Sequence, residues 1–222
     1  MAFFSQGGRE LRVDTQTFNF TYERDYSSEE ALFTESAIPS QERIEAIASD
    51  LLRKLGSYHK IFAAGATNLT YLRYDPQTKD VETLPSAQGA TMVEVDYFQP
   101  DLLGLRVVTE KYFTSTNHLV FAFPGGVPTL LKGEIAVWEL DTDRAGTYSL
   151  ITGDEAWDRL QRKQAIIVAN QNPSSTIKIE SMYLAYLEPS TYQPYFQPVY
   201  VFQGANNFIA YVPAVKQPEK DN

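Results

Sequence analysis

The chain has 222 residues, of which 43% are hydrophobic and 21% are charged. This length and composition are those of a chain with a substantial core, and they exclude a disordered, collagen-like or coiled-coil protein. Since 28 acidic residues outnumber 19 basic ones, the net charge is −9, the chain repels phosphate backbones, and nucleic acid is not an expected partner. The absence of cysteine excludes a disulfide scaffold, a thiol nucleophile and a cysteine-ligated metal.

The first predicted element is a helix over 40–55. Apolar residues recur there at three- and four-residue spacing, beginning at Ile44, and build one apolar stripe. Basic residues occupy the last turn, and Gly56 follows it. Because glycine takes the left-handed conformation that ends many helices, we expect the helix to stop at Gly56.

A second helix is predicted to begin at Thr152 and to run to about Lys163. Thr152 and Glu155 have the spacing of a capping box, in which each side chain accepts a hydrogen bond from the other residue's backbone amide. Ala156, Trp157 and Leu160 form its expected buried side.

Most of the remaining chain has the alternation and composition of β-strands. Branched and aromatic residues alternate with polar ones in short segments bounded by glycine, proline, asparagine and aspartate. The predicted strands are 11–24, 67–74, 91–98, 105–110, 117–123, 133–141, 147–151, 165–170, 177–188, 197–203 and 207–213.

The order of these elements indicates an internal repeat. Each half contains a strand, then a helix, then an antiparallel meander of strands. We therefore predict an α+β fold made of two β-α-β-meander units, each an antiparallel sheet with a helix packed on one face. The predicted units are 1–115 and 116–222, with their junction inside 104–133.

Few residues have the spacing of a metal or catalytic site. The two histidines, His59 and His118, lack a second ligand at metal-binding spacing and are interpreted as surface residues. Gly125 and Gly126 lie between two prolines, a composition typical of a hairpin turn rather than of a phosphate-binding loop. We expect no cofactor and no metal.

Glu94 and Asp96 are the carboxylates with the most suggestive spacing. Residues two apart on a strand share one face, so the two side chains are about 7 Å apart. A glycoside hydrolase uses two carboxylates at a comparable separation, but any strand with a solvated face shows the same pattern. We expect these carboxylates on a solvated face.

The most distinctive segment contains Tyr192, Tyr195 and Phe196, with prolines on both sides. Neighbouring residues on a strand face opposite sides, so some of these rings are expected at the surface, where tyrosine favours protein binding. Together with Glu188 and Gln197 they form the predicted partner-binding site. An equally weighted alternative places the rings in the core.

Several strings resemble bacterial YycH/YycI-type proteins and the related PepSY-like domains. They are Thr152-Gly-Asp-Glu-Ala-Trp157 opening a helix, the strand Tyr-Leu-Ala-Tyr, the string Gln197-Pro-Val-Tyr-Val-Phe202, and the closing Phe-Ile-Ala-Tyr-Val-Pro. These are packing residues, and no functional residue of the family is carried over to this sequence, because no site motif matches.

The resemblance implies a regulatory domain outside the cytoplasm, tethered by a membrane anchor that this chain does not contain. Its expected partner is another envelope or membrane protein, such as a sensor kinase, and no enzymatic activity is expected. Two alternatives are a carbohydrate-active hydrolase that uses Glu94, Asp96 or Glu188, and a structural subunit of an envelope assembly. A cytoplasmic location is the alternative to the expected extracytoplasmic one.

Overall fold

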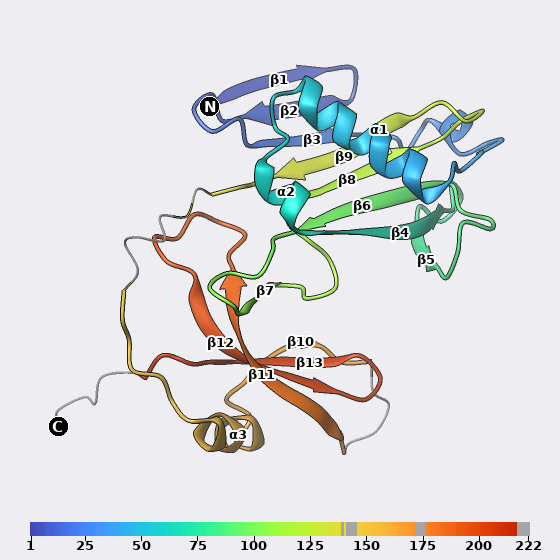
Figure 1. The fold of residues 1–222 in the computed structure, drawn as a ribbon. Helices are drawn as coiled ribbons and strands as arrows, with labels where there is room; N and C mark the ends of the chain where they lie inside the picture. The colour runs from blue at the N-terminus through green and yellow to red at the C-terminus, as the bar shows by residue number, and fades with distance from the viewer. Residues whose placement is uncertain (139, 141–145, 172–175, 217–222) are drawn as a thin grey trace. The chain divides into compact units, whose positions relative to one another are not determined.

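A computed structural model describes residues 1–138, 140, 146–171 and 176–216 (Figure 1). The fold is of mixed α+β content but dominated by strands, with 41% strand and 15% helix in two sheets. The helices are η1 (Glu30–Leu32), α1 (Gln41–Lys54), α2 (Lys60–Ala64) and α3 (Gly153–Gln161). The strands are β1 (Ala2–Gln6), β2 (Arg9–Val13), β3 (Phe20–Arg24), β4 (Ala66–Tyr74), β5 (Val81–Leu84), β6 (Met92–Phe98), β7 (Arg106–Thr109), β8 (His118–Ala122), β9 (Thr129–Ile135), β10 (Ile166–Ala169), β11 (Ile179–Glu188), β12 (Gln197–Gly204) and β13 (Phe208–Pro213).

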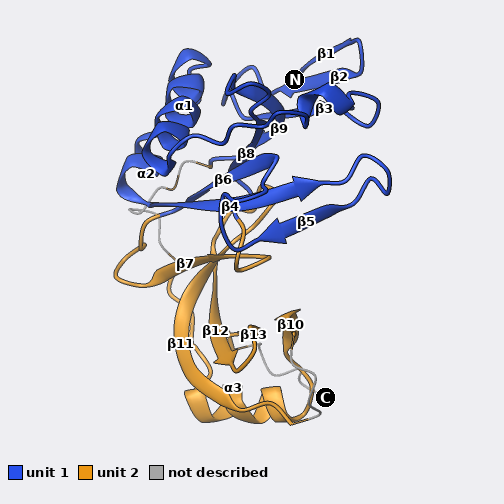
Figure 2. Ribbon diagram, turned by 90° about the vertical axis from the view of Figure 1, so that its right-hand side faces the viewer, with its two compact units in different colours: residues 1–99, 115–137 blue, residues 100–114, 138–222 orange. Residues whose placement is uncertain are grey.

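The chain forms two compact units that alternate along the sequence (Figure 2). Unit 1 contains residues 1–99 and 115–137, and unit 2 contains residues 100–114 and 138–222. These bounds differ from the predicted 1–115 and 116–222. β8 and β9 pair with strands of the first sheet, and β7 pairs with a strand of the second, so each half of the sequence contributes to both sheets.

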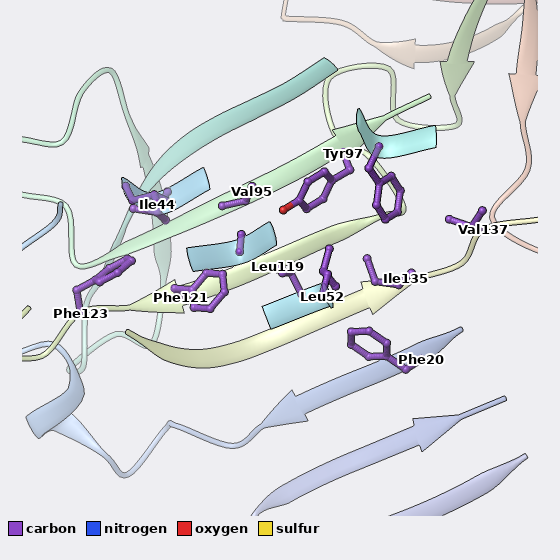
Figure 3. Packing of buried hydrophobic residues seen from close by; sticks show 13 residues of the cluster. Phe20, Ile44, Leu52, Val95, Tyr97, Leu119, Phe121, Phe123, Ile135 and Val137 are labelled. Atoms are coloured by element: carbon purple, nitrogen blue, oxygen red, sulfur yellow. The ribbon is translucent and has the colours of Figure 1, made fainter. Parts of the chain in front are cut away.

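Unit 1 is built on an eight-stranded antiparallel sheet. Its strand order is β1-β2-β3-β9-β8-β6-β4-β5. Figure 3 shows that Ile44 and Leu52 of α1 pack against β-strand residues such as Leu119, all three of which are fully buried. Burying the apolar stripe of α1 against this sheet provides the main core of the unit.

The predicted helix over 40–55 is confirmed as α1, and Gly56 has the expected left-handed backbone, with a φ of 71°. The short helix α2 was not predicted, because five residues are too few to show helical periodicity. Gly65 follows it with no room for a side chain, since a Cβ there would lie 1.9 Å from the backbone oxygen of Phe98.

The predicted strand 11–24 is wrong, because this segment is a hairpin of β2 and β3. Asp14 makes the turn: its carboxylate accepts hydrogen bonds from the backbone amides of Gln16 and Thr17, at 2.8 and 3.1 Å. An aspartate that caps its own loop in this way interrupts a strand despite apolar residues on both sides. Strands β1 and β5 at the two edges of the sheet were also missed.

The face of this sheet opposite α1 has its own smaller apolar cluster. The rings of Tyr26, Phe33 and Tyr74 meet edge to face or tilted, with centroids 4.6 to 5.5 Å apart, and they belong to one cluster with the buried Met92 and Leu131. The segment after β3 therefore covers one part of the sheet face opposite α1. It does not cover the rest of that face.

Unit 2 is a five-stranded sheet with the order β10-β13-β12-β11-β7. The strands β10 to β13 pair antiparallel, but β7 pairs parallel to β11. The predicted purely antiparallel sheet is therefore wrong for this unit. The predicted strand 147–151 is also wrong, because only Leu150 forms an isolated bridge. The two predicted β-α-β units are not confirmed.

The helix of unit 2 begins as predicted. Thr152 and Glu155 form both hydrogen bonds of the capping box. A cluster that includes Ala156 of α3 and Phe202, both fully buried, joins the helix to the sheet. The β12–β13 hairpin turns through residues 205–207, between the paired Gly204 and Phe208. Asn206 and Asn207 both have a φ of 55°, a left-handed conformation that asparagine adopts more readily than most residues.

Buried asparagine and aspartate side chains connect the ends of strands in unit 1 by hydrogen bonds. The Asn19 side chain donates to the carbonyl of Val137 and accepts from its amide, at 2.9 and 3.0 Å. Asp96 accepts from the backbone amide of Ser115 at 2.7 Å, and Asn117 accepts from Ala136 at 2.8 Å. These contacts lie where the chain enters or leaves the unit, so polar side chains there replace the backbone partners that a longer strand would supply.

Within the described residues, no helix has the length and apolar character needed to span a membrane.

Candidate functional site

The aromatic–proline loop, residues 189–196, joins β11 to β12 in unit 2. Tyr192 is 68% exposed and Tyr195 is 53% exposed, whereas Phe196 is only 9% exposed. The sequence left surface and core positions equally weighted for these rings. In the structure two of them face solvent, and the third is buried inside the unit.

Contacts at several points hold this loop in place. Pro189 is buried and Pro194 fixes its own backbone torsion, which limits the conformations of the residues between them. The amide of Ser190 donates to the carboxylate of Glu110 at 3.2 Å. The ring of Tyr192 meets Trp138 edge to face, with centroids 5.4 Å apart. The exposed tyrosines are therefore presented on an ordered loop.

Two other predicted partner-binding residues have different positions. Glu188 is 1% exposed at the end of β11, where it pairs in register with Thr109 of β7. Gln197 is exposed as the first residue of β12. The side chains of Glu188 and Phe196 are both buried, so their contact with a partner stays a prediction that the burial does not favour. The sequence could not show this, because the burial of Glu188 depends on the parallel pairing with β7.

Three other tyrosines of unit 2, Tyr112, Tyr183 and Tyr211, belong to the apolar cluster on the sheet face opposite α3. Tyr112 and Tyr183 join their hydroxyls at 3.0 Å, and Tyr211 donates to the carbonyl of Thr109 at 2.7 Å. The guanidinium of Arg106 lies 5.2 Å from the centre of the Tyr183 ring. The hydroxyls of these phenols thus form hydrogen bonds within the unit, and Tyr211 is buried.

Alkaline titration should report on the burial of three phenols, Tyr97, Tyr183 and Tyr211. Burial raises the pKa of Tyr97 to about 12, and burial also raises the pKa of Tyr183 and Tyr211 above the ordinary value. The folded state therefore favours the neutral phenols, and this stabilisation is complete below the unfolded pKa of about 10 and is lost as the pH rises through the folded pKa.

We expect tyrosinate absorbance from these phenols to appear only together with loss of circular dichroism. A Tyr211→Phe variant should lack part of the absorbance rise that accompanies unfolding. If it instead lacks part of the rise that precedes unfolding, Tyr211 is accessible in the folded protein.

The carboxylates Glu94 and Asp96 do share one face of β6, the face opposite α1. Asp96, however, is fully buried and accepts the amide of Ser115, while Glu94 is half-buried. The expectation that both lie on a solvated face is wrong, because the chain segment at Ser115 covers Asp96. A hydrolase that needs both carboxylates at one accessible site is not supported by this arrangement.

Glu94 lines a groove of about 650 Å³ on the face of the unit 1 sheet opposite α1, here called the sheet-face groove. Its floor is apolar and includes Leu72, Met92, Val120 and Leu131, and its rim carries charged residues. The full lining is Ser5, Gly8, Glu10, Glu23, Arg24, Asp25, Tyr26, Leu72, Val81, Met92, Glu94, Val120, Leu131 and Lys132. A volume of this size is in the range of ligand-binding pockets.

A smaller groove of about 450 Å³ lies beside α1 in the same unit. It is lined by polar residues of the helix, among them Glu42, Asp50 and Arg53, and by Tyr58 and Phe62. The guanidinium of Arg53 already lies over the ring of Tyr58, 4.5 Å from its centre, and pairs with Asp50 at 2.9 Å. The guanidinium of Arg53 in this groove therefore already has partners within the protein.

Neither histidine supports a metal site. His118 is 9% exposed, with ring Nδ1 3.1 Å from the carbonyl oxygen of Thr116, so its interpretation as a surface residue is wrong. His59 is half-buried and meets Phe62 edge to face at 5.7 Å. In the part of the chain that the structure describes, no three histidine, aspartate or glutamate side chains are grouped to hold a metal ion.

The geometry thus offers two accessible features, the aromatic–proline loop in unit 2 and the sheet-face groove in unit 1. Comparison with known proteins adds no functional assignment to either feature: no protein-family model, no curated protein and no solved structure matches the chain.

Proposed function

We propose that this chain is a non-enzymatic binding module that recognises another protein through Tyr192 and Tyr195. The observation that carries the proposal is the exposure of both rings, 68% and 53%, on a loop whose flanking residues Pro189 and Phe196 are buried. A loop fixed at both ends presents its side chains to a partner with little further loss of conformational entropy.

Tyrosine suits this role for physical reasons. Its ring offers a large apolar contact area with few rotatable bonds, and its hydroxyl can form a hydrogen bond at the edge of an interface. Interfaces concentrate much of their binding free energy in a few such residues. In this proposal Phe196 and Glu188 hold the two ends of the loop in place, since both are buried there.

The proposed partner is the extracytoplasmic part of another envelope or membrane protein, such as a sensor kinase. This part of the proposal depends on the resemblance to YycH/YycI-type and PepSY-like domains. The same resemblance is the reason for proposing a regulatory role in a bacterial envelope. The net charge of −9 favours a partner surface with basic residues near the contact.

Replacing Tyr192 and Tyr195 together by alanine is expected to weaken partner binding by about tenfold or more, since truncating an important interface residue costs more than about 1 kcal/mol. The immobilised chain would be incubated with detergent-solubilised membranes of its host, and the protein retained by the wild type would be identified. Its affinity for the wild type and the double variant would then be measured with purified components.

Tyr148→Ala is a matched control, because Tyr148 belongs to the same unit and is 54% exposed. It should bind as the wild type does, and both variants should unfold at the wild-type denaturant concentration. Equal loss of binding in the control, or a strongly destabilised double variant, would contradict a contact role for the loop.

A further inference from the structure

The sheet-face groove of unit 1 has charges that its own side chains do not balance. Four carboxylates line it, Glu10, Glu23, Asp25 and Glu94, against two cations, Arg24 and Lys132. Glu29, which is outside the lining, forms both charge-assisted hydrogen bonds to the Arg24 guanidinium. The groove therefore has an excess of negative charge in a protein that is itself strongly acidic.

The register of the sheet places four of these charged residues in one row. Glu10, Glu23, Lys132, Val120 and Glu94 are successive cross-strand partners on β2, β3, β9, β8 and β6. Strands are about 4.8 Å apart, so Glu23 and Glu94 lie about 14 Å from each other across the groove. Within the described residues neither of them has a cation within 4.0 Å.

Glu94 is the most informative of these residues. It is half-buried above apolar neighbours, with Val120 opposite it on β8 and Thr70 opposite it on β4. A partly desolvated carboxylate gains more from a positive partner than a fully solvated one does, since water screens the interaction less. An ammonium group placed at Glu94 would supply the charge that the groove lacks.

We propose that the sheet-face groove binds an extended peptide segment of another protein that carries lysine side chains, with one lysine ammonium at Glu94. The lysine stem is apolar, and it would lie over the floor formed by Met92 and Leu72 while its charged end reaches the carboxylate. A span of about 14 Å accommodates about four residues of extended chain. This inference goes beyond the aromatic–proline loop, because it involves a different unit and a different set of residues.

Fluorescence anisotropy tests this with a short labelled peptide of alternating lysine and valine, measured at low and at physiological ionic strength. The wild type should bind this peptide and should not bind the corresponding glutamate–valine peptide. Glu94→Gln, which keeps the shape of the side chain, is expected to weaken binding about tenfold. Val81→Lys, at a groove residue that is 48% exposed, should weaken it similarly by repelling the peptide.

Glu42→Gln is the matched control. It removes the same charge from the same unit, but it lies on α1 and lines the smaller groove. Binding should change less than twofold in this variant, which would show that the site, and not the net charge, is responsible. The proposal is overturned if the wild type does not bind the lysine peptide at low ionic strength, if Glu42→Gln weakens binding as much as Glu94→Gln does, or if Val81→Lys binds as tightly as the wild type. If Glu94→Gln does not fold, the exposed Val81→Lys variant decides the question.

Discussion

Replacing Phe202 by alanine is expected to lower the free energy of unfolding of unit 2 by about 3–5 kcal/mol. Phe202 is fully buried in the cluster between α3 and the sheet, and its ring lies 6.1 Å from that of Trp157. The substitution removes a large apolar group and leaves a cavity that the sheet around it cannot fill, because β11 and β13 pair with both sides of β12.

Tryptophan fluorescence during urea unfolding measures this effect selectively. The chain has two tryptophans, Trp138 and Trp157, and both belong to unit 2. Ile166→Ala serves as the control, since Ile166 lies in the same sheet but is 57% exposed, and a change within about 0.5 kcal/mol is expected there. A similar loss of stability in the two variants would mean that Phe202 is not at the centre of the core.

Asn19→Ala is expected to destabilise unit 1 by about 2–4 kcal/mol. The side chain of Asn19 is 8% exposed and makes hydrogen bonds to both the amide and the carbonyl of Val137. Removing it leaves two buried backbone groups without those partners, and each such group costs about 1–3 kcal/mol. Circular dichroism during urea unfolding is the suitable measurement, because unit 1 contains no tryptophan.

Asn68→Ala provides the comparison for this prediction. Asn68 is exposed in β4, and its amide makes one long hydrogen bond to Thr70, at 3.4 Å. Its replacement should change stability by no more than about 0.5 kcal/mol. If Asn19→Ala unfolds at the same urea concentration as Asn68→Ala, water replaces the Asn19 side chain and the two bonds add little net stability.

The two long helices could be predicted because their signals are local. The apolar stripe that begins at Ile44, the left-handed Gly56 and the capping box at Thr152 each lie within a few residues of the helix that they define. Strand pairing is different, since it depends on contacts far apart in the chain. No residue of β7 indicates that it pairs in parallel with β11, so the assignment of strands to sheets failed there.

The candidate sites show the same division. The concentration of tyrosine and proline marked the aromatic–proline loop, and the surface exposure of Tyr192 and Tyr195 agrees with the idea that some rings face outward. The burial of Glu188 and Asp96 was not foreseeable, because it results from β7 and from the segment at Ser115. The sheet-face groove was not predicted from the sequence. Its row of residues comes from five strands, and only the pairing register of these strands places the residues side by side.

The alternation of the two units along the chain also affects the order in which the protein can be completed during translation. β7 leaves the ribosome about eighty residues before β11, the strand with which it pairs. Until then the edge strand has no sheet to join, and closing so long a loop makes late pairing slow. A nascent chain stopped after residue 137 would contain all of the unit 1 segments but only the first segment of unit 2. Cutting the chain after residue 99 would release both segments of unit 2, but together with residues 115–137 of unit 1. Expressing unit 2 alone would therefore require joining 100–114 to the later segment by an artificial linker.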